Sequence, residues 1–147
     1  MGAHRNRSRC PIAFCLDVVG DRWTLLILRD LAFFRRRSFG DFLASAEGIS
    51  SNILAERLRR LERSGLVVRV PDPQDRRRAR FFLTEDGLDL LPVLVEMTIW
   101  GGRRHPNSSV PRAQLERWSD HREELIARQR GEHAAEREQA LADLSVA

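Results

Sequence analysis

Lysine and tyrosine are absent from this chain of 147 residues, and cysteine occurs only at positions 10 and 15. All 25 basic residues are therefore arginines, whose planar guanidinium suits phosphate groups and base edges. The two cysteines and four scattered histidines do not have the spacing of a metal site, so neither a metal nor a cofactor is expected. Two cysteines without a disulfide framework are typical of a reducing compartment.

Long hydrophobic runs are missing as well, which excludes a membrane-spanning helix. The arginine-rich start is followed by an apolar stretch that Asp17 interrupts, so no secretory signal is expected. Paired catalytic carboxylates and a glycine-rich phosphate loop are not recognisable either. We therefore expect a cytoplasmic protein that does not bind membranes and is not an enzyme.

The charge is unevenly distributed along the chain. Residues 1–80 contain 17 arginines against 9 acidic residues, a net charge of +8. Residues 81–147 contain 8 arginines against 12 acidic residues, a net charge of −4. This asymmetry is typical of a nucleic-acid-binding module followed by an assembly segment.

A pair of short helices is predicted in the basic half. Ser38 and Asp41 have the spacing of a capping box that opens a helix over Phe39–Ala46. Ser50 or Ser51 caps the next helix, which runs to about Ser64. Two short helices joined by a glycine-containing turn are the signature of a helix-turn-helix. Helices with apolar spacing are expected before them, over Pro11–Val19 and Arg22–Phe34, with Arg35–Arg37 as a solvated turn.

A hairpin and more helices are predicted to follow the helix pair. Leu66–Val70 and Arg78–Leu83 are the expected strands, with Phe81 and Leu83 on one face, and they form a wing. Further helices are expected over Glu85–Trp100, ended by Gly101-Gly102, and over Arg112–Arg130, with a frayed end beyond. The predicted fold is mainly α with a small β-hairpin. It comprises a flexible arm (1–9), a winged helix-turn-helix domain with flanking dimerisation helices (10–104), a linker (105–111) and a helical extension (112–147).

The second helix of the pair and the wing carry the candidate DNA contacts. Leucines of the helix share one face, which leaves a polar face whose N-terminal half would enter the major groove of double-stranded DNA. The hairpin tip would reach phosphates or the minor groove through arginines. The candidate contacts are Arg35, Arg36, Arg37, Ser38, Ser50, Ser51, Asn52, Ala55, Glu56, Arg59, Arg60, Arg76, Arg77, Arg78 and Arg80. Such a protein would be associated with the nucleoid.

Several blocks resemble the HxlR-type winged helix-turn-helix transcriptional regulators of bacteria. They are Cys10-Pro11, the run 18–31, Phe39-Gly40-Asp41-Phe42, Ile49-Ser50, Arg57-Leu58, Gly65-Leu66-Val67, Leu83-Thr84-Glu85-Asp86-Gly87 and Trp100. Gly-Leu-Val and Leu-Thr-Glu-x-Gly are shared with the MarR-type regulators, whereas the N-terminal blocks favour HxlR. The chain departs from the family pattern at Phe81, usually tyrosine, and at Ser38, often arginine.

The resemblance implies a homodimer on a roughly two-fold-symmetric operator. The dimer would be made by the N-terminal helix and by the helix after the wing, and the candidate contacts are Ile12, Leu16, Leu91, Leu94, Val95 and Trp100. A subset of the family senses oxidants or electrophiles through a cysteine that corresponds to Cys10. Arg7, Arg9 and the start of a helix would stabilise a thiolate there.

The same sequence features fit alternative functions. The chain is also consistent with a winged-helix module that binds protein without reading DNA. A thiol enzyme that uses Cys10 is disfavoured, because the spacing of the sequence places no general base beside this cysteine. A small-molecule effector is a further possibility, in a pocket where Trp23, Trp100 and Trp118 meet. Operator, effector, and repression or activation are not encoded in any recognisable pattern.

Overall fold

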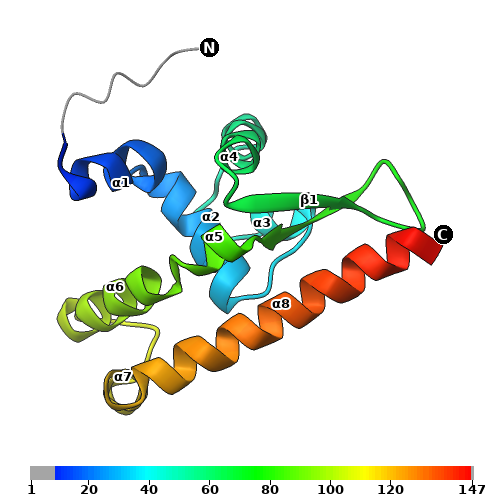
Figure 1. Ribbon diagram of the computed structural model, residues 1–147. Helices are drawn as coiled ribbons and strands as arrows, with labels where there is room; N and C mark the ends of the chain where they lie inside the picture. Colours follow the sequence, from blue (N-terminus) through cyan, green and yellow to red (C-terminus); the bar gives the residue numbers. More distant parts are fainter. Residues whose placement is uncertain (1–8, 147) are drawn as a thin grey trace.

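The computed structural model describes residues 9–146 and shows a mainly helical chain with one two-stranded antiparallel sheet (Figure 1). The elements are α1 (Pro11–Val19), α2 (Arg22–Phe33), α3 (Phe39–Leu43), α4 (Ser51–Arg63), β1 (Val67–Pro71), β2 (Ala79–Leu83), α5 (Glu85–Leu88), α6 (Leu91–Arg104), α7 (Arg112–Asp120) and α8 (Arg122–Val146). The predicted fold class is confirmed. The predicted arm lies outside the described residues apart from Arg9. Within residues 9–146, no helix is long and apolar enough to cross a membrane.

Helices α3 and α4 form the helix-turn-helix, and side-chain caps set both helix starts. The hydroxyl of Ser38 accepts from the backbone amide of Asp41 (3.1 Å), and the carboxylate of Asp41 accepts from the amide of Ser38 (2.8 Å). This is the predicted capping box. Ser50 caps α4. Helix α3 ends at Leu43 rather than at the predicted Ala46, so the turn between the helices is longer than expected.

The core joins α2, α4 and the hairpin. Leucines repeating along α4 form one buried stripe because they recur at helical spacing. The fully buried side chains at this junction include Leu28, Leu31, Leu54, Leu58 and Leu61. Truncating any one of them to alanine is expected to cost about 2–5 kcal/mol. This packing fixes the polar face of α4 toward the outside.

The wing is covered on both faces. Phe81 and Leu83 pack into the main core as predicted. Phe82, one position out of phase, is also buried, against Val70 of β1 and Ala140 of α8. Alternation is missing from β2 because α8 lies along the second face of the hairpin (Figure 1).

The helix predicted over Glu85–Trp100 is two helices. α5 ends after a single turn, and α6 starts with Pro92 in its first turn, where a proline needs no amide partner. The predicted stop at Gly101-Gly102 is wrong, since α6 continues through both glycines to Arg104.

The helix predicted over Arg112–Arg130 is also two helices, which meet at His121. The end expected to fray is helical to Val146. α7 packs closely on α6. The approach is so close that a Cβ at Gly102 would lie 2.7 Å from a methyl group of Leu115. Gly102 therefore lies at a close contact between α6 and α7 and does not end α6.

Candidate DNA-binding surface

The polar face of α4 is the first part of the candidate surface. Because the leucines face the core, Ser50, Ser51, Asn52 and Arg59 are exposed on the opposite side. The N-terminus of α4 also presents backbone amides that suit a phosphate. The Nε atom of Arg59 donates to the carbonyl of Ala55 (3.2 Å). This face combines groups suited to phosphates with groups suited to base edges.

Three other predicted contacts on α4 are less accessible. Ala55 and Glu56 are half-buried, and Glu56 forms an ion pair with the neighbouring Arg57. Arg60 donates to the backbone carbonyl of Asp17 (2.5 Å), which ties α4 to α1. The Arg60 side chain is therefore bonded to α1 and is less available for a contact with DNA.

Arg57 is a positioning residue that the sequence did not reveal. Its Nε lies 2.9 Å from Oδ1 of Asp21, the N-cap of α2, which also accepts from the amide of Thr24. Burial raises the pKa of Asp21, but the hydrogen bonds from Thr24 and Arg57 outweigh it and lower that pKa to about 2. Asp21 lies directly before α2, but the sequence held no local signal for its distant partner Arg57.

The wing tip is the second part of the surface. Arg76, Arg77 and Arg78 are exposed, and the side chain of Arg77 is 91% accessible while it pairs with Asp75 (3.1 Å). Arg80 differs, because it is half-buried with its guanidinium 5.6 Å from the Phe82 ring centroid. Three of the four predicted arginines, Arg76, Arg77 and Arg78, are thus exposed to solvent at the wing tip.

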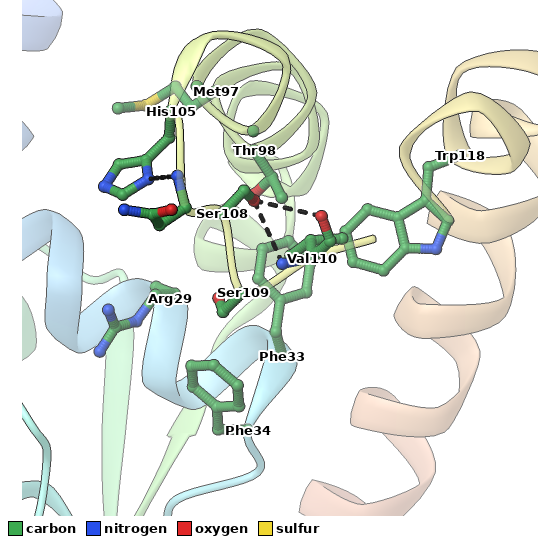
Figure 2. Close-up of a pocket in the computed structure, with 13 residues that line it drawn as sticks. Arg29, Phe33, Phe34, Met97, Thr98, His105, Ser108, Ser109, Val110 and Trp118 are labelled. Atoms are coloured by element: carbon green, nitrogen blue, oxygen red, sulfur yellow. Dashed lines mark hydrogen bonds between the residues drawn. The ribbon is translucent and has the colours of Figure 1, made fainter. Parts of the chain in front are cut away.

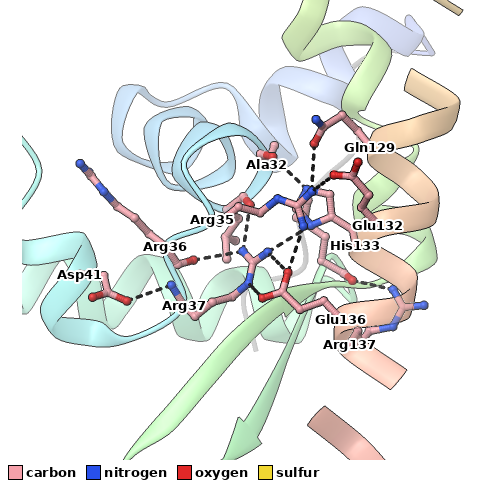
Figure 3. Close-up of polar contacts among 12 residues, drawn as sticks. Ala32, Arg35, Arg36, Arg37, Asp41, Gln129, Glu132, His133, Glu136 and Arg137 are labelled. Atoms are coloured by element: carbon pink, nitrogen blue, oxygen red, sulfur yellow. Dashed lines mark hydrogen bonds and ion pairs between the residues drawn. The ribbon is translucent and has the colours of Figure 1, made fainter. Parts of the chain in front are cut away.

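The turn Arg35–Arg37 differs from the prediction. Arg37 is only 7% exposed, so the expectation of a solvated turn is wrong at this residue. Its Nη2 lies 2.7 Å from Oε2 of Glu136, and its Nη1 donates to the carbonyl of Leu31 (2.9 Å). Arg35 pairs with Glu132 (2.5 Å) and Glu136 (3.1 Å). As Figure 3 shows, α8 supplies the carboxylates, in place of the DNA phosphates that these arginines were expected to contact.

The remaining predicted contacts near this turn are also engaged. Arg36 lies 2.8 Å from the buried carboxylate of Asp30, and the side chain of Ser38 is committed to the capping box. Arg36 and Ser38 are therefore less available to bind a DNA phosphate than the arginines of the wing tip.

A buried histidine completes the cluster in Figure 3. His133 is 2% exposed, its Nε2 lies 2.9 Å from the carbonyl oxygen of Ala32, and its Nδ1 lies 3.3 Å from Nη2 of Arg37. Both contacts suit the neutral ring with the proton on Nε2. Burial lowers the pKa of His133 to about 4. The hydrogen bond from Arg37 lowers the pKa of Glu136 below its ordinary value.

The predicted dimer contacts divide into two groups. Leu91, Leu94 and Val95 are at most 5% exposed and belong to the chain's own core, so the expectation that they contact a second subunit is corrected. Exposed apolar side chains instead lie on α1 and on the outer side of α6. They are Ile12, Phe14, Leu16, Val93, Met97 and Trp100.

The two cysteines lie in different environments. Cys10 is the N-cap residue of α1 and is exposed. Cys15 is half-buried against the main core, in agreement with a packing role.

The three tryptophans do not meet, so the predicted aromatic junction is wrong. Trp100 is 63% exposed with Arg104 over its ring, Trp23 lines a small cavity beside α3, and Trp118 packs on Phe33. A different pocket contains Trp118 alone of the three.

Comparisons with known proteins agree with this geometry. Rv3095, an HTH-type transcriptional regulator of Mycobacterium tuberculosis, is 45% identical over 100 residues, which cover 68% of this chain and 62% of that protein. The chain thus matches less than two thirds of this relative's length. PA1607, described as a candidate transcription factor, is 38% identical with a TM-score of 0.63, covering 74% of this chain and 75% of that one. The redox regulator HypR in its oxidized form is 28% identical with a TM-score of 0.59, covering 67% and 100%.

The fold, the polar face of α4 and the basic wing define a winged helix-turn-helix protein. The model of the HxlR-like helix-turn-helix family matches residues 18–109. The chain belongs to this family, which confirms the resemblance carried by its sequence blocks.

Proposed function

We propose that the chain is a sequence-specific DNA-binding regulator that acts as a homodimer on a roughly palindromic operator. The N-terminal half of α4 enters the major groove, where Asn52 contacts base edges, and Arg59 adds a base contact two turns further along the same face. The observation that carries this proposal is the exposed polar face of α4, presented beside a wing whose tip holds three exposed arginines. Such a protein works at the nucleoid, in the cytoplasm.

The wing contacts the DNA backbone or the minor groove through Arg76, Arg77 and Arg78. Arg80, Ser50 and Ser51 add contacts near the two elements, whereas Arg35 and Arg37 are assigned to holding α8. This division follows from which guanidinium groups are exposed and which are already paired with carboxylates of the chain.

Two copies associate through the exposed apolar side chains of α1 and α6. Ile12, Leu16 and Trp100 are the predicted contacts that remain exposed in the single chain. A two-fold axis would place two copies of α4 on half-sites separated by about one helical turn of DNA, or a multiple of it.

Cys10 is the proposed site at which an oxidant or electrophile acts. Cys10 is exposed at the start of α1, and the structurally similar HypR is named a redox regulator. Mild oxidant followed by non-reducing electrophoresis tests this. An intersubunit disulfide that Cys10→Ser abolishes and Cys15→Ser retains is expected. The absence of both a disulfide and a change in DNA affinity would leave Cys10 structural.

Selection of bound sequences from a random DNA pool tests the main proposal, because it yields an operator and its half-site spacing together. Arg59→Ala is expected to weaken binding to the selected operator about tenfold or more, and to weaken non-specific binding less. Arg128→Ala, on the exposed side of α8, removes the same charge and is the matched control. Equal affinity for all sequences would favour the alternative, a winged-helix module that binds protein.

A further inference from the structure

A pocket of about 480 Å³ lies where the end of α2 meets the C-terminal part of α6, residues 105–110 and α7 (Figure 2). This size lies within the range of pockets that hold small organic molecules. Val110 and Trp118, which form one side, lie beyond the part of the chain that matches the family model. The pocket therefore depends on the C-terminal extension of this chain.

The walls of the pocket are largely aromatic. The rings of Phe33 and Trp118 lie with centroids 5.9 Å apart and planes inclined by 31°. Phe34 is 58% exposed at the pocket, and Met97 is half exposed on the opposite helix. Aromatic and thioether walls favour a flat ring system over a branched aliphatic one.

The charge that reaches the pocket is already balanced. Arg29 lines it, but Nη1 of Arg29 lies 2.5 Å and Nη2 lies 3.0 Å from the two carboxylate oxygens of Glu47. Asp30 also binds the same guanidinium (2.6 Å). A charged ligand would thus find no uncompensated partner among the described lining residues.

Neutral polar groups lie on the loop side of the pocket. The Nδ1 atom of His105 accepts from the amide of Asn107 (3.1 Å), which leaves Nε2 to carry the ring proton in the neutral form. Ser109 is exposed beside them. These groups suit a hydroxyl or carbonyl substituent at one edge of a ring system.

We propose that this pocket binds an uncharged, planar aromatic compound of about two rings that carries one hydroxyl or carbonyl substituent. Its ring stacks among Phe33, Phe34 and Trp118, and its substituent faces His105 and Ser109.

Occupancy of the pocket changes the affinity of the chain for DNA, a step that rests on the proposed function. Glu47 lies in the turn between α3 and α4, so Arg29 joins the pocket wall to the turn that leads into the recognition helix. The Arg29 guanidinium also lies 5.2 Å from the Phe34 ring centroid. A ring that packs against Phe34 and Arg29 thus contacts the residue that holds this turn.

Two glycines provide a matched pair of variants. Gly101 lines the pocket, and a Cβ built on it meets no atom within 4 Å, so Gly101→Leu places a side chain in the space beside the pocket. Gly131 in α8 has equally open surroundings but does not line the pocket. Leucine favours helix over glycine, so both variants are expected to fold, which thermal unfolding checks.

Binding is measured by titration calorimetry of the full chain with 2-naphthol. A dissociation constant on the order of 10–100 µM is expected for a ligand of this size. Gly101→Leu is expected to weaken binding at least tenfold, while Gly131→Leu leaves it unchanged. 2-Naphthalenesulfonate and the non-planar 2-decalol should both bind more weakly, because one is charged and the other is not flat.

The outcomes separate this inference from the proposed function. Absence of saturable 2-naphthol binding, or equal weakening by both leucine variants, overturns the ligand site. If Gly101→Leu instead changes the oligomeric state in sedimentation, and 2-naphthol does not bind, the pocket belongs to a subunit contact. Specific operator binding that does not respond to bound 2-naphthol overturns the coupling to DNA. Binding of 2-naphthol by a chain that selects no DNA sequence supports the ligand site and counts against the proposed function.

Discussion

Oε2 of Glu136 lies 2.7 Å from Nη2 of Arg37, although 99 residues separate the two in the sequence. This ion pair fastens α8 to the segment that enters the helix-turn-helix. Arg35 pairs with the same carboxylate. Its backbone has a φ of 53°, and it is the only non-glycine residue with a positive φ in the range 9–146. The extension thus forms part of the same folded unit as the helix-turn-helix.

Neutralising Glu136 should destabilise the chain. In Glu136→Gln the nearly buried guanidinium of Arg37 loses its main counter-charge, and we expect the free energy of unfolding to fall by about 1–2 kcal/mol. Urea denaturation measures this. Glu138→Gln, at an exposed position of the same helix, should change stability by less than about 0.5 kcal/mol. Equal effects in the two variants would show that the ion pair contributes nothing specific.

Stability should fall as the pH drops from 7 to 5 because His133 is buried in its neutral form. The unfolded chain takes up a proton near pH 6.5, whereas the folded chain takes it up only near pH 4, so acid favours unfolding in this window. The expected loss between pH 7 and 5 is about 2 kcal/mol. Arg35, Arg37 and Glu136 surround the ring, and the two arginines oppose its protonation.

The variant His133→Gln separates this effect from the carboxylates. Its amide nitrogen can still donate to the carbonyl of Ala32, but it does not titrate. We expect a nearly flat stability between pH 7 and 5, because Asp21 and Glu136 lose their favourable ionised forms only below the unfolded carboxyl pKa values of about 4. An unchanged slope in this variant would contradict the role of His133.

The contact of α8 with the wing should depend on Ala140, which is 2% exposed against Val70 and Phe82. Ala140→Glu would bury a carboxylate on this apolar face, so α8 should detach and stability should fall by about 2–4 kcal/mol. Hydrogen exchange of backbone amides should rise in β1, β2 and the end of α8. Ala142→Glu, at an exposed position, should leave the exchange of the hairpin unchanged.

The helix-turn-helix could be predicted because its signals are local. The Ser38–Asp41 capping box and the leucine stripe of α4 lie within a few residues of the structure they specify. The environments of Phe82 and Arg37 could not be predicted, because each depends on α8, which follows far along the chain. Three arginines in a row look like solvated surface until the carboxylates that bind them are located.

The N-cap of α2 should contribute through both its hydrogen bonds and its charge. Asp21→Ala removes the acceptor for Thr24 and the partner of Arg57, and we expect a loss of about 2 kcal/mol. Asp21→Asn retains a good cap but loses the ion pair with Arg57, so its loss should be about half as large. Thermal unfolding of both variants checks the order. Equal losses would assign the whole effect to the charge.

The wing arginines should control the salt dependence of DNA binding. Removing one phosphate interaction reduces the slope of log K against log salt concentration by about 0.9. Replacing Arg76, Arg77 and Arg78 by alanine in both subunits of the proposed homodimer should therefore reduce the slope by up to about 5. The matched control replaces Arg112, Arg117 and Arg128, which are exposed on α7 and α8 and carry the same total charge. If the wing lies on the DNA backbone, only the first triple variant flattens the salt dependence, whereas equal flattening in both would mean that net charge alone attracts the DNA.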